Sequence, residues 1–186
     1  MRLDHFRSFS EYFYVPQGIS PKFGYWQQGV GSDLFSKVSG VGIIAEDLGI
    51  LDPGVFNLLK LTGYPGMNVW QFTANEMQEM TDEEMSGRIF CSGTHDNHPI
   101  LAWYKLNLNP EDARARAEEA IRWLFESKAP WVMITLQDML MLDDDARLNT
   151  PGTCNDKNWK WRCDRSLLTD EVSVKYMKLA GETGRR

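Results

Sequence analysis

The stretch Val41-Gly-Ile-Ile-Ala-Glu-Asp-Leu-Gly49 contains an apolar run followed by two carboxylates. Asp52-Pro53 follows closely and indicates the start of a helix. Residues 41–45 are predicted to form a short buried strand. Asp52-Pro53 is typical of a helix N-cap with proline at the first helical position, and Gly63 is expected to stop that helix. Glu46 therefore stands where a strand ends, which is where α/β folds carry their chemistry.

The same order recurs along the chain. Further strands are expected at residues 2–4, 66–72, 88–92 and 131–135, with helices at residues 97–106, 109–127 and 167–179. Strands that alternate with helices indicate an α/β fold with a parallel sheet. Polar residues follow each strand: Asp4, Glu46, Gln71, Asp96 and Gln137. Chemistry at the carboxyl ends of parallel strands is typical of a (β/α)8 TIM barrel, but five strands make an incomplete barrel.

Two segments depart from this alternation. Residues 6–38 are rich in Gly, Pro, Ser and aromatic residues without a clear period, which predicts a long excursion near the site with at most a short helix at residues 33–38. The last segment, residues 166–186, is expected to be a helix with a frayed tail from Gly181. We interpret residues 1–186 as a single partial TIM-barrel catalytic domain.

Composition and charge argue against several classes of partner and site. The net charge is −6 and the pI is about 5.1, which argues against nucleic acid as a partner. No apolar run approaches the roughly 20 residues of a membrane span, and the start of the chain does not resemble a signal peptide. The three scattered cysteines favour reduced thiols in a cytoplasmic protein over a disulfide framework or a metal site. No cofactor is expected.

Asp4, Glu46 and Asp96 are candidates for one acidic site built from three strand ends. Two carboxylates that face each other across a sugar linkage are the working groups of a retaining glycosidase or transglycosylase. The alternative for each residue alone is a helix cap or a surface ion pair. Asp47 is expected to be structural and to cap the following turn.

Several short motifs together point to one family. They are Arg2-Leu-Asp-His-Phe-Arg7, Ile44-Ala-Glu-Asp-Leu-Gly49, Tyr64-Pro-Gly-Met67 with Gln71-Phe72, Gly93-Thr-His-Asp-Asn97, Leu136-Gln-Asp-Met-Leu140, Ala146-Arg-Leu-Asn149 with Pro151-Gly-Thr153, and Asn158-Trp-Lys-Trp-Arg162. In this order they resemble the C-terminal half of the 4-alpha-glucanotransferases (amylomaltases or disproportionating enzymes) of glycoside hydrolase family 77. The resemblance covers nearly the whole chain and implies about strands 4–8 of the barrel.

The resemblance also implies roles. Asp4 would be the nucleophile, Glu46 the general acid/base and Asp96 the stabiliser of the transition state. Residues implied or proposed to bind the substrate, a maltodextrin or other alpha-1,4-glucan, are Arg2, Tyr25, Trp26, Gln71, His95, Asn97 and Trp159. Arg2 would keep Asp4 ionised, and the aromatic residues would serve as platforms for sugar rings. Trp103 is a further candidate platform.

The chain departs from the family pattern at His98-Pro99-Ile100, where the family often has Asp-Thr-Thr, and at Ser8, where it usually has Gly. We expect a truncated chain whose partner is the N-terminal half of the barrel. Two other functions stay open: a catalytically inactive glucan-binding remnant and an alpha-amylase-type hydrolase. The motif at residues 158–162 speaks against the hydrolase.

Overall fold

A computed structural model describes residues 1–38 and 40–185 of the chain. The chain forms two compact units. Unit 1 consists of Met1–Met67 and Gly87–Ile89, and unit 2 consists of Asn68–Ser86 and Phe90–Arg186, of which Arg186 lies outside the described residues. Each unit is described by itself below.

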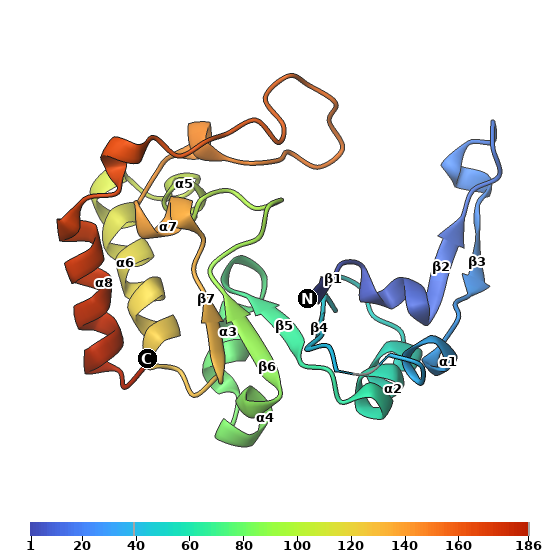
Figure 1. The fold of residues 1–186 in the computed structure, drawn as a ribbon. Helices are drawn as coiled ribbons and strands as arrows, with labels where there is room; N and C mark the ends of the chain where they lie inside the picture. The colour runs from blue at the N-terminus through green and yellow to red at the C-terminus, as the bar shows by residue number, and fades with distance from the viewer. Residues whose placement is uncertain (39, 186) are drawn as a thin grey trace. The chain divides into compact units, whose positions relative to one another are not determined.

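Unit 1 begins with two short parallel strands, β1 (Arg2–Leu3) and β4 (Ile44–Ala45), in which Arg2 pairs with Ile44 and Leu3 with Ala45. The other elements of this unit are η1 (Phe6–Phe9), β2 (Glu11–Tyr14), η2 (Pro21–Phe23), β3 (Tyr25–Gln28), α1 (Ser32–Phe35) and α2 (Pro53–Thr62) (Figure 1). Helix α2 begins and ends as predicted, because the Asp52 carboxylate accepts the Gly54 N–H at 2.7 Å and Gly63 takes a left-handed conformation, φ 66°.

The excursion contains an antiparallel hairpin that the sequence did not predict. Strands β2 and β3 pair Phe13 with Trp26 and Tyr14 with Tyr25. Large aromatic residues project from both faces of the hairpin. The sequence therefore lacks the alternation of apolar and polar residues by which a strand is usually predicted. The short α1 at Ser32–Phe35 agrees with the expected helix near residues 33–38.

The core of unit 1 is small and largely aromatic. Phe6 and Phe35 are buried and their ring centroids lie 5.5 Å apart, while Tyr64 meets Phe35 edge to face at 5.4 Å. Val55 and Leu58 of α2 complete it. These contacts pack α2 against the segment after β1 and against Ala45 of β4.

Unit 2 is built around longer helices. Its elements are α3 (Trp70–Glu79), α4 (Asp82–Ser86), α5 (Ile100–Lys105), α6 (Pro110–Glu126), β7 (Trp131–Met133), α7 (Leu136–Met139), η3 (Asp144–Ala146), η4 (Arg165–Leu167) and α8 (Asp170–Glu182). Strands β5 (Gly66–Val69) and β6 (Arg88–Cys91) are shared between the units, and the sheet order is β5-β6-β7. Within unit 2, α6 packs against α5 and α8 (Figure 1).

Helix α6 supplies much of the unit 2 core. Asn109 caps it by accepting the N–H groups of Glu111 and Asp112, and Pro110 occupies the first helical position. Its buried residues recur at helical spacing, Ala113, Ala117, Ala120, Ile121 and Leu124, and they pack with Phe90 and Trp70. The small alanines let neighbouring helices approach closely.

The structure corrects several boundaries. The five expected strands are present but shorter, and they lie in two sheets, β1-β4 and β5-β6-β7, rather than in one. The strand expected at residues 66–72 ends at Val69, so that Gln71 lies in the first turn of α3. The final helix runs to Glu182, and Arg185 is not frayed, because its guanidinium donates to the carbonyls of Phe125, Ser127 and Ala129.

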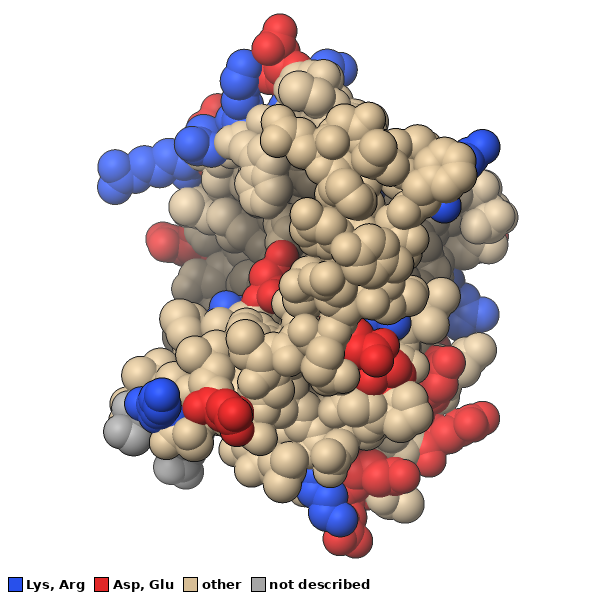
Figure 2. Space-filling view, turned by 90° about the vertical axis from the view of Figure 1, so that its right-hand side faces the viewer, with Lys and Arg blue, Asp and Glu red and all other residues tan. Residues whose placement is uncertain are grey.

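No helix among residues 1–38 and 40–185 is long and apolar enough to cross a membrane. The face shown in Figure 2 is covered largely by uncharged side chains, with acidic and basic groups scattered over it. That face therefore presents no broad basic surface of the kind that binds nucleic acid.

Candidate active site

Asp4 and Glu46 directly follow two neighbouring parallel strands of unit 1. The backbone pairing of β1 and β4 continues beyond the strands, because the Glu46 N–H donates to the Leu3 carbonyl at 3.0 Å and the Phe6 N–H donates to the Glu46 carbonyl at 2.9 Å. The two acidic residues therefore stand beside each other at the same edge of the strand pair.

The Glu46 carboxylate is fixed by the backbone on both sides. One oxygen accepts the N–H of His5 at 2.5 Å, and the other accepts the N–H of Leu48 at 2.9 Å. His5 can donate in this direction because it adopts a left-handed conformation, with φ 50°, which is uncommon for a residue other than glycine. The residue after Asp4 thus holds the side chain of Glu46.

Asp4 makes an ion pair with Arg2, with 2.6 Å between Nη2 and Oδ1, and its side chain is 66% exposed. A solvent-facing carboxylate at a strand end is accessible to a substrate. The ion pair places Arg2 beside Asp4, and its role in catalysis stays a prediction.

Asp47 has a structural role, but the expected cap of the following turn is wrong. Its side chain is 1% exposed and pairs with Arg88, which donates to both carboxylate oxygens at 2.5 and 3.2 Å. The Met67 N–H donates to the same carboxylate at 2.7 Å. A Cβ at Gly66 would lie 2.2 Å from Arg88 Nη1 and 2.6 Å from Asp47 Oδ2, so a larger residue there would displace this ion pair. The turn is capped by Glu46 instead, through Leu48.

The two proposed platforms of the hairpin, Tyr25 and Trp26, are both half exposed but project from opposite faces of β3, because successive strand residues alternate. The Arg7 guanidinium lies over the Trp26 ring at 4.0 Å and donates to the Ile50 carbonyl at 2.6 Å. One face of the Trp26 indole is therefore occupied by Arg7, whereas Tyr25 meets Tyr14 edge to face.

Unit 2 brings five predicted site residues into one cluster. His95 Nε2 lies 3.4 Å from Asp96 Oδ1, and the His95 ring lies 5.2 Å from the Trp159 ring between centroids. Trp159 has a positive φ of 65°, and its N–H donates to the Leu148 carbonyl at 2.7 Å, which places the indole beside His95.

Asn97 and Gln71 complete this cluster. The Asn97 side-chain oxygen accepts the N–H and the hydroxyl of Thr94, each at 2.8 Å, so that it shapes the turn carrying His95 and Asp96. Its amide nitrogen lies 3.5 Å from Gln71 Oε1, and the Gln71 amide donates to the His98 carbonyl at 2.7 Å. Both residues hold the loop from beneath, and Asn97 is buried.

The structure adds two residues for which the sequence analysis predicts no role. Asn149 Nδ2 donates to Asp96 Oδ1 at 2.6 Å, and Arg147 Nη2 donates to the Asp96 carbonyl at 2.7 Å. Arg147 also contacts His98, which pairs with Asp144. The motif at residues 146–149 pointed to this segment, but only the structure connects it with Asp96.

Asp138 is a third residue that sequence reasoning missed. Its carboxylate is buried and accepts the Ser92 hydroxyl and the Ile100 N–H, each at 2.6 Å, so that it joins β6 to the start of α5. Burial raises the pKa of this carboxyl above its usual range, and the hydrogen bonds from Ser92 and Ile100 oppose that rise.

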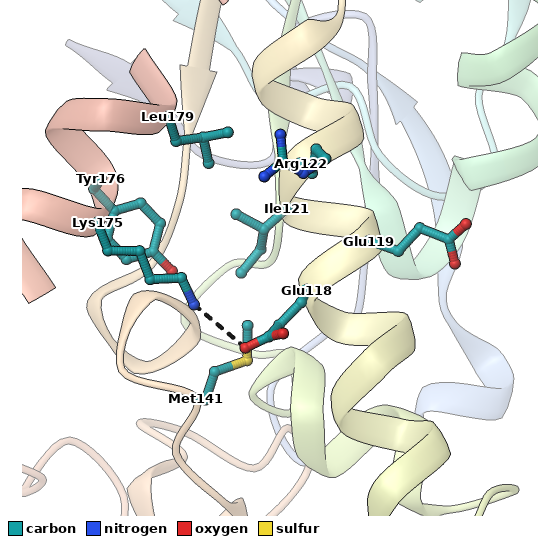
Figure 3. A pocket seen from close by; sticks show the side chains of 8 residues that line it. All are labelled: Glu118, Glu119, Ile121, Arg122, Met141, Lys175, Tyr176 and Leu179. Atoms are coloured by element: carbon teal, nitrogen blue, oxygen red, sulfur yellow. Dashed lines mark hydrogen bonds and ion pairs between the residues drawn. The ribbon is translucent and has the colours of Figure 1, made fainter. Parts of the chain in front are cut away.

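Two pockets of unit 2 differ in their chemistry. One of about 630 Å³ is lined by polar residues next to the Asp96 cluster, among them Asp144, Arg147, Asn158 and Trp161. Another of about 310 Å³ lies between α6 and α8, and Figure 3 shows Ile121, Tyr176 and Leu179 facing it. Its rim includes the Lys175–Glu118 pair at 3.3 Å, and the predicted site residues lie elsewhere.

The structure thus assembles the site in two parts. Unit 1 brings together Arg2, Asp4 and Glu46, and unit 2 brings together Gln71, His95, Asp96, Asn97 and Trp159. That all three carboxylates surround one sugar ring stays a prediction.

Comparison with known proteins identifies the family. The profile of the 4-alpha-glucanotransferase family matches residues 1–168. A 4-alpha-glucanotransferase from Streptococcus pneumoniae is 34% identical over 199 residues, which cover 96% of this chain and 39% of that protein. One from Thermus thermophilus is 32% identical and aligns with 100% of this chain and 42% of its own length.

A solved structure agrees with the sequence relatives. The amylomaltase from Streptococcus agalactiae, determined in complex with acarbose, matches with a TM-score of 0.85 and 29% identity over 99% of this chain and 41% of that one. The chain therefore spans about two fifths of the length of these relatives. The chain belongs to the 4-alpha-glucanotransferase family.

Proposed function

We propose that this chain carries the catalytic carboxylates of a 4-alpha-glucanotransferase that moves segments of alpha-1,4-glucan between maltodextrins. The observation that carries the proposal is the placement of Asp4 and Glu46 side by side at the ends of paired parallel strands. Neighbouring strands lie about 4.8 Å apart. That spacing is close to the roughly 5–5.5 Å between the carboxyl groups of retaining glycosidases.

The proposed reaction gives each carboxylate one role. Asp4 attacks the anomeric carbon of the donor, while Glu46, in its protonated form, gives its proton to the glycosidic oxygen that leaves. A glucosyl group is then bonded to Asp4. Glu46 next removes the proton from the 4-hydroxyl of a second glucan, which attacks the anomeric carbon and releases Asp4. Two inversions leave the alpha configuration unchanged, and transfer exceeds hydrolysis when the acceptor excludes water.

Unit 2 supplies the remaining roles in this proposal. Asp96 stabilises the positive charge that develops on the sugar ring, and His95 donates to a sugar hydroxyl. Trp159, which lies beside His95, offers an aromatic face for stacking. The pocket next to this cluster, about 630 Å³, is large enough for sugar residues.

We further propose that both units are parts of one TIM-barrel domain, corresponding to about strands 4–8, in a cytoplasmic protein. The share of the relatives that this chain spans supports the N-terminal half of the barrel as a partner that completes this domain. The S. agalactiae amylomaltase was solved with acarbose, which makes acarbose a suitable probe for glucan binding here.

The test is incubation of the chain with maltotriose. Glucose together with maltodextrins longer than the substrate is the expected result. Glu46→Gln should lower the rate by about 10²–10⁴-fold, the usual contribution of a general acid/base. Asp4→Asn should abolish transfer. Glu119→Gln, at an exposed ion pair on α6, is the matched control and should leave the rate unchanged.

Other outcomes identify the alternatives. Net release of reducing ends without longer products would indicate a hydrolase of the alpha-amylase type. Acarbose binding without any product would indicate a glucan-binding remnant. If neither binding nor products are found, a chimera that replaces the matching segment of the S. pneumoniae relative tests whether the catalytic residues work inside a whole barrel.

A further inference from the structure

A chain of polar contacts runs from Asp144 to Asp96 within unit 2. Asp144 Oδ1 lies 2.6 Å from His98 Nδ1, and Arg147 Nη1 lies 2.9 Å from His98 Nε2 and 3.2 Å from Nδ1. Arg147 then reaches the loop of the proposed site, because its Nη2 donates to the Asp96 carbonyl at 2.7 Å and its Nε donates to the Asn149 carbonyl at 2.9 Å. Asn149 closes the path through Asp96 Oδ1.

The partners of His98 define its tautomer. Asp144 can only accept a hydrogen bond in its ionised form, so Nδ1 must carry the proton. Arg147 Nη1 lies 2.9 Å from Nε2 and 3.2 Å from Nδ1, so the guanidinium lies over the ring face, where its positive charge favours an uncharged ring. The ring therefore fits its surroundings as the neutral Nδ1–H form. Gln71 fixes the same residue from the backbone by donating to the His98 carbonyl.

Asp96 depends on this support. Its side chain is 44% exposed and is held by Asn149 and by His95 at its outer end. The backbone around Asp96 is held by the Arg147 guanidinium. Two of its nitrogens donate to the carbonyls of Asp96 and Asn149, and the third contacts His98. A planar guanidinium with three fixed acceptors has one orientation, and loss of one acceptor frees it to turn.

We propose that His98 is a positioning residue for Asp96, which it holds through Arg147, and that protonation of His98 at Nε2 loosens this part of the site. The resemblance leads one to expect an aspartate at this position, which would pair with an arginine without titrating near neutral pH. Histidine at position 98 therefore makes the support of Asp96 dependent on pH in this chain. The kinetic part of the proposal rests on the proposed function, whereas the structural part does not.

The charges around His98 set the direction of the effect. Asp144 and Arg147 contact the ring directly; beyond them lie the His95–Asp96 contact and the ion pair of Lys105 with Asp143. A protonated ring is attracted to Asp144 and stays bound at Nδ1. The positive charge of the protonated ring then opposes that of the Arg147 guanidinium, which lies over the ring. Acid therefore displaces Arg147 and leaves His98 in place.

Nitrogen-15 NMR of the imidazole groups tests the structural part. The chain has three histidines, so their ring signals can be assigned by substitution. At neutral pH, His98 should show a protonated Nδ1 and an unprotonated Nε2. On acidification, the Arg147 Nε–H and the Asn149 side-chain amide should shift together with the His98 ring. An Nε2–H tautomer, or an Asn149 amide that does not follow the ring, would overturn the proposal.

Variants test the positioning role. His98→Leu should lower kcat for maltotriose transfer about tenfold with KM little changed, as expected when a barrier rises by about 1.4 kcal/mol. The double variant His98→Asp/Asp144→Asn keeps an acceptor for Arg147, so it should restore kcat. In a plot of kcat against pH, it should also lose the decrease at acidic pH that protonation of His98 causes. Asp82→Asn, at an exposed position in α4 of the same unit, is the control.

The two experiments separate the two hypotheses. If the wild-type chain makes no transfer products, the proposed function fails for this chain, and the NMR titration still decides whether His98 supports Asp96. In that case, His98→Leu should release the Asn149 amide from hydrogen-exchange protection, and the double variant should restore it. A His98→Leu variant with unchanged protection and unchanged kcat contradicts the positioning role.

Discussion

The two units of this chain are stabilised in different ways. Unit 1 has a small core, in which Phe6 and Phe35 pack with α2, and it relies on polar links such as the Asp47–Arg88 pair. Unit 2 has a larger core that α6 organises, with Phe90 and Leu124 fully buried. Asp4 and Glu46 therefore belong to the part whose geometry depends on a few directional contacts, whereas Asp96 belongs to the part supported by extensive burial.

The same substitution in each core should show this difference most strongly. Phe90→Ala in unit 2 and Phe6→Ala in unit 1 each remove a fully buried ring, and such changes cost about 3–5 kcal/mol. We expect Phe90→Ala near the upper value, because the surrounding helices cannot collapse into the cavity. Native-state hydrogen exchange measures each unit separately. Phe56→Ala, at an exposed ring of α2, is the control. If Phe6→Ala lowers the stability of unit 1 more than Phe90→Ala lowers that of unit 2, unit 1 depends more on its core than we infer.

Arg88→Met should be the next largest perturbation and should act on unit 1. It leaves the Asp47 carboxylate, which is 1% exposed, without its partner. Breaking a buried pair in this way costs about 3 kcal/mol or somewhat more. Hydrogen exchange at Met67, whose N–H donates to Asp47, should accelerate. Arg116→Met, at an exposed pair on α6, provides the comparison. Equal stability of the two variants would show that the buried pair does not support unit 1.

Arg185→Met tests the polar contribution to unit 2. The guanidinium donates to carbonyls at the end of α6 and just beyond it, where a positive charge is also favourable. Loss of hydrogen bonds from a charged donor should cost about 2 kcal/mol. Urea unfolding followed by Trp fluorescence measures the change, with Arg114→Met as control. A loss as large as that of Phe90→Ala would mean that unit 2 also depends on polar links.

Asp138→Asn should have the smallest effect and should appear as a change in pH dependence. Burial raises the pKa of Asp138 in the folded chain above its ordinary value of 3.8. The folded chain therefore binds more protons than the unfolded chain between these two pKa values, so stability falls as pH rises through that window. The asparagine variant removes this slope and can still accept the Ile100 N–H. Urea midpoints from about pH 3.5 to about pH 6 measure it, and an unchanged slope contradicts the assignment.

Elements with strong local signals were predictable from sequence. Helix α6 and the start of α2 follow from Asn109-Pro110 and Asp52-Pro53, which specify a cap and a first turn without help from the rest of the chain. The β2–β3 hairpin was missed because its aromatic residues occupy both faces. The end of β5 was misplaced because the apolar run continues into α3 at Trp70.

The sequence predicts candidate residues for the site but not their contacts. The motifs point to Asp4, Glu46 and Asp96 as one site, and the structure pairs the strands that carry the first two. The partners of Asp47 and Asp96 could not be predicted, since Arg88 lies 41 residues from Asp47 and Arg147 lies 51 residues from Asp96. Contacts at such separations depend on packing, which local sequence patterns do not record.

The boundary between the units falls inside β5, after Met67, and inside β6, after Ile89. The three residues Gly87–Ile89 return the chain to unit 1 and deliver Arg88 to Asp47. A gene fragment that stops at Thr62 would still encode Asp4 and Glu46 but would leave Asp47 without its counter-ion. A fragment that carries Asp4 and Glu46 together with an intact Asp47–Arg88 pair must therefore extend at least to Ile89. Because the chain leaves unit 1 and returns to it, one cut in the sequence cannot separate the two units.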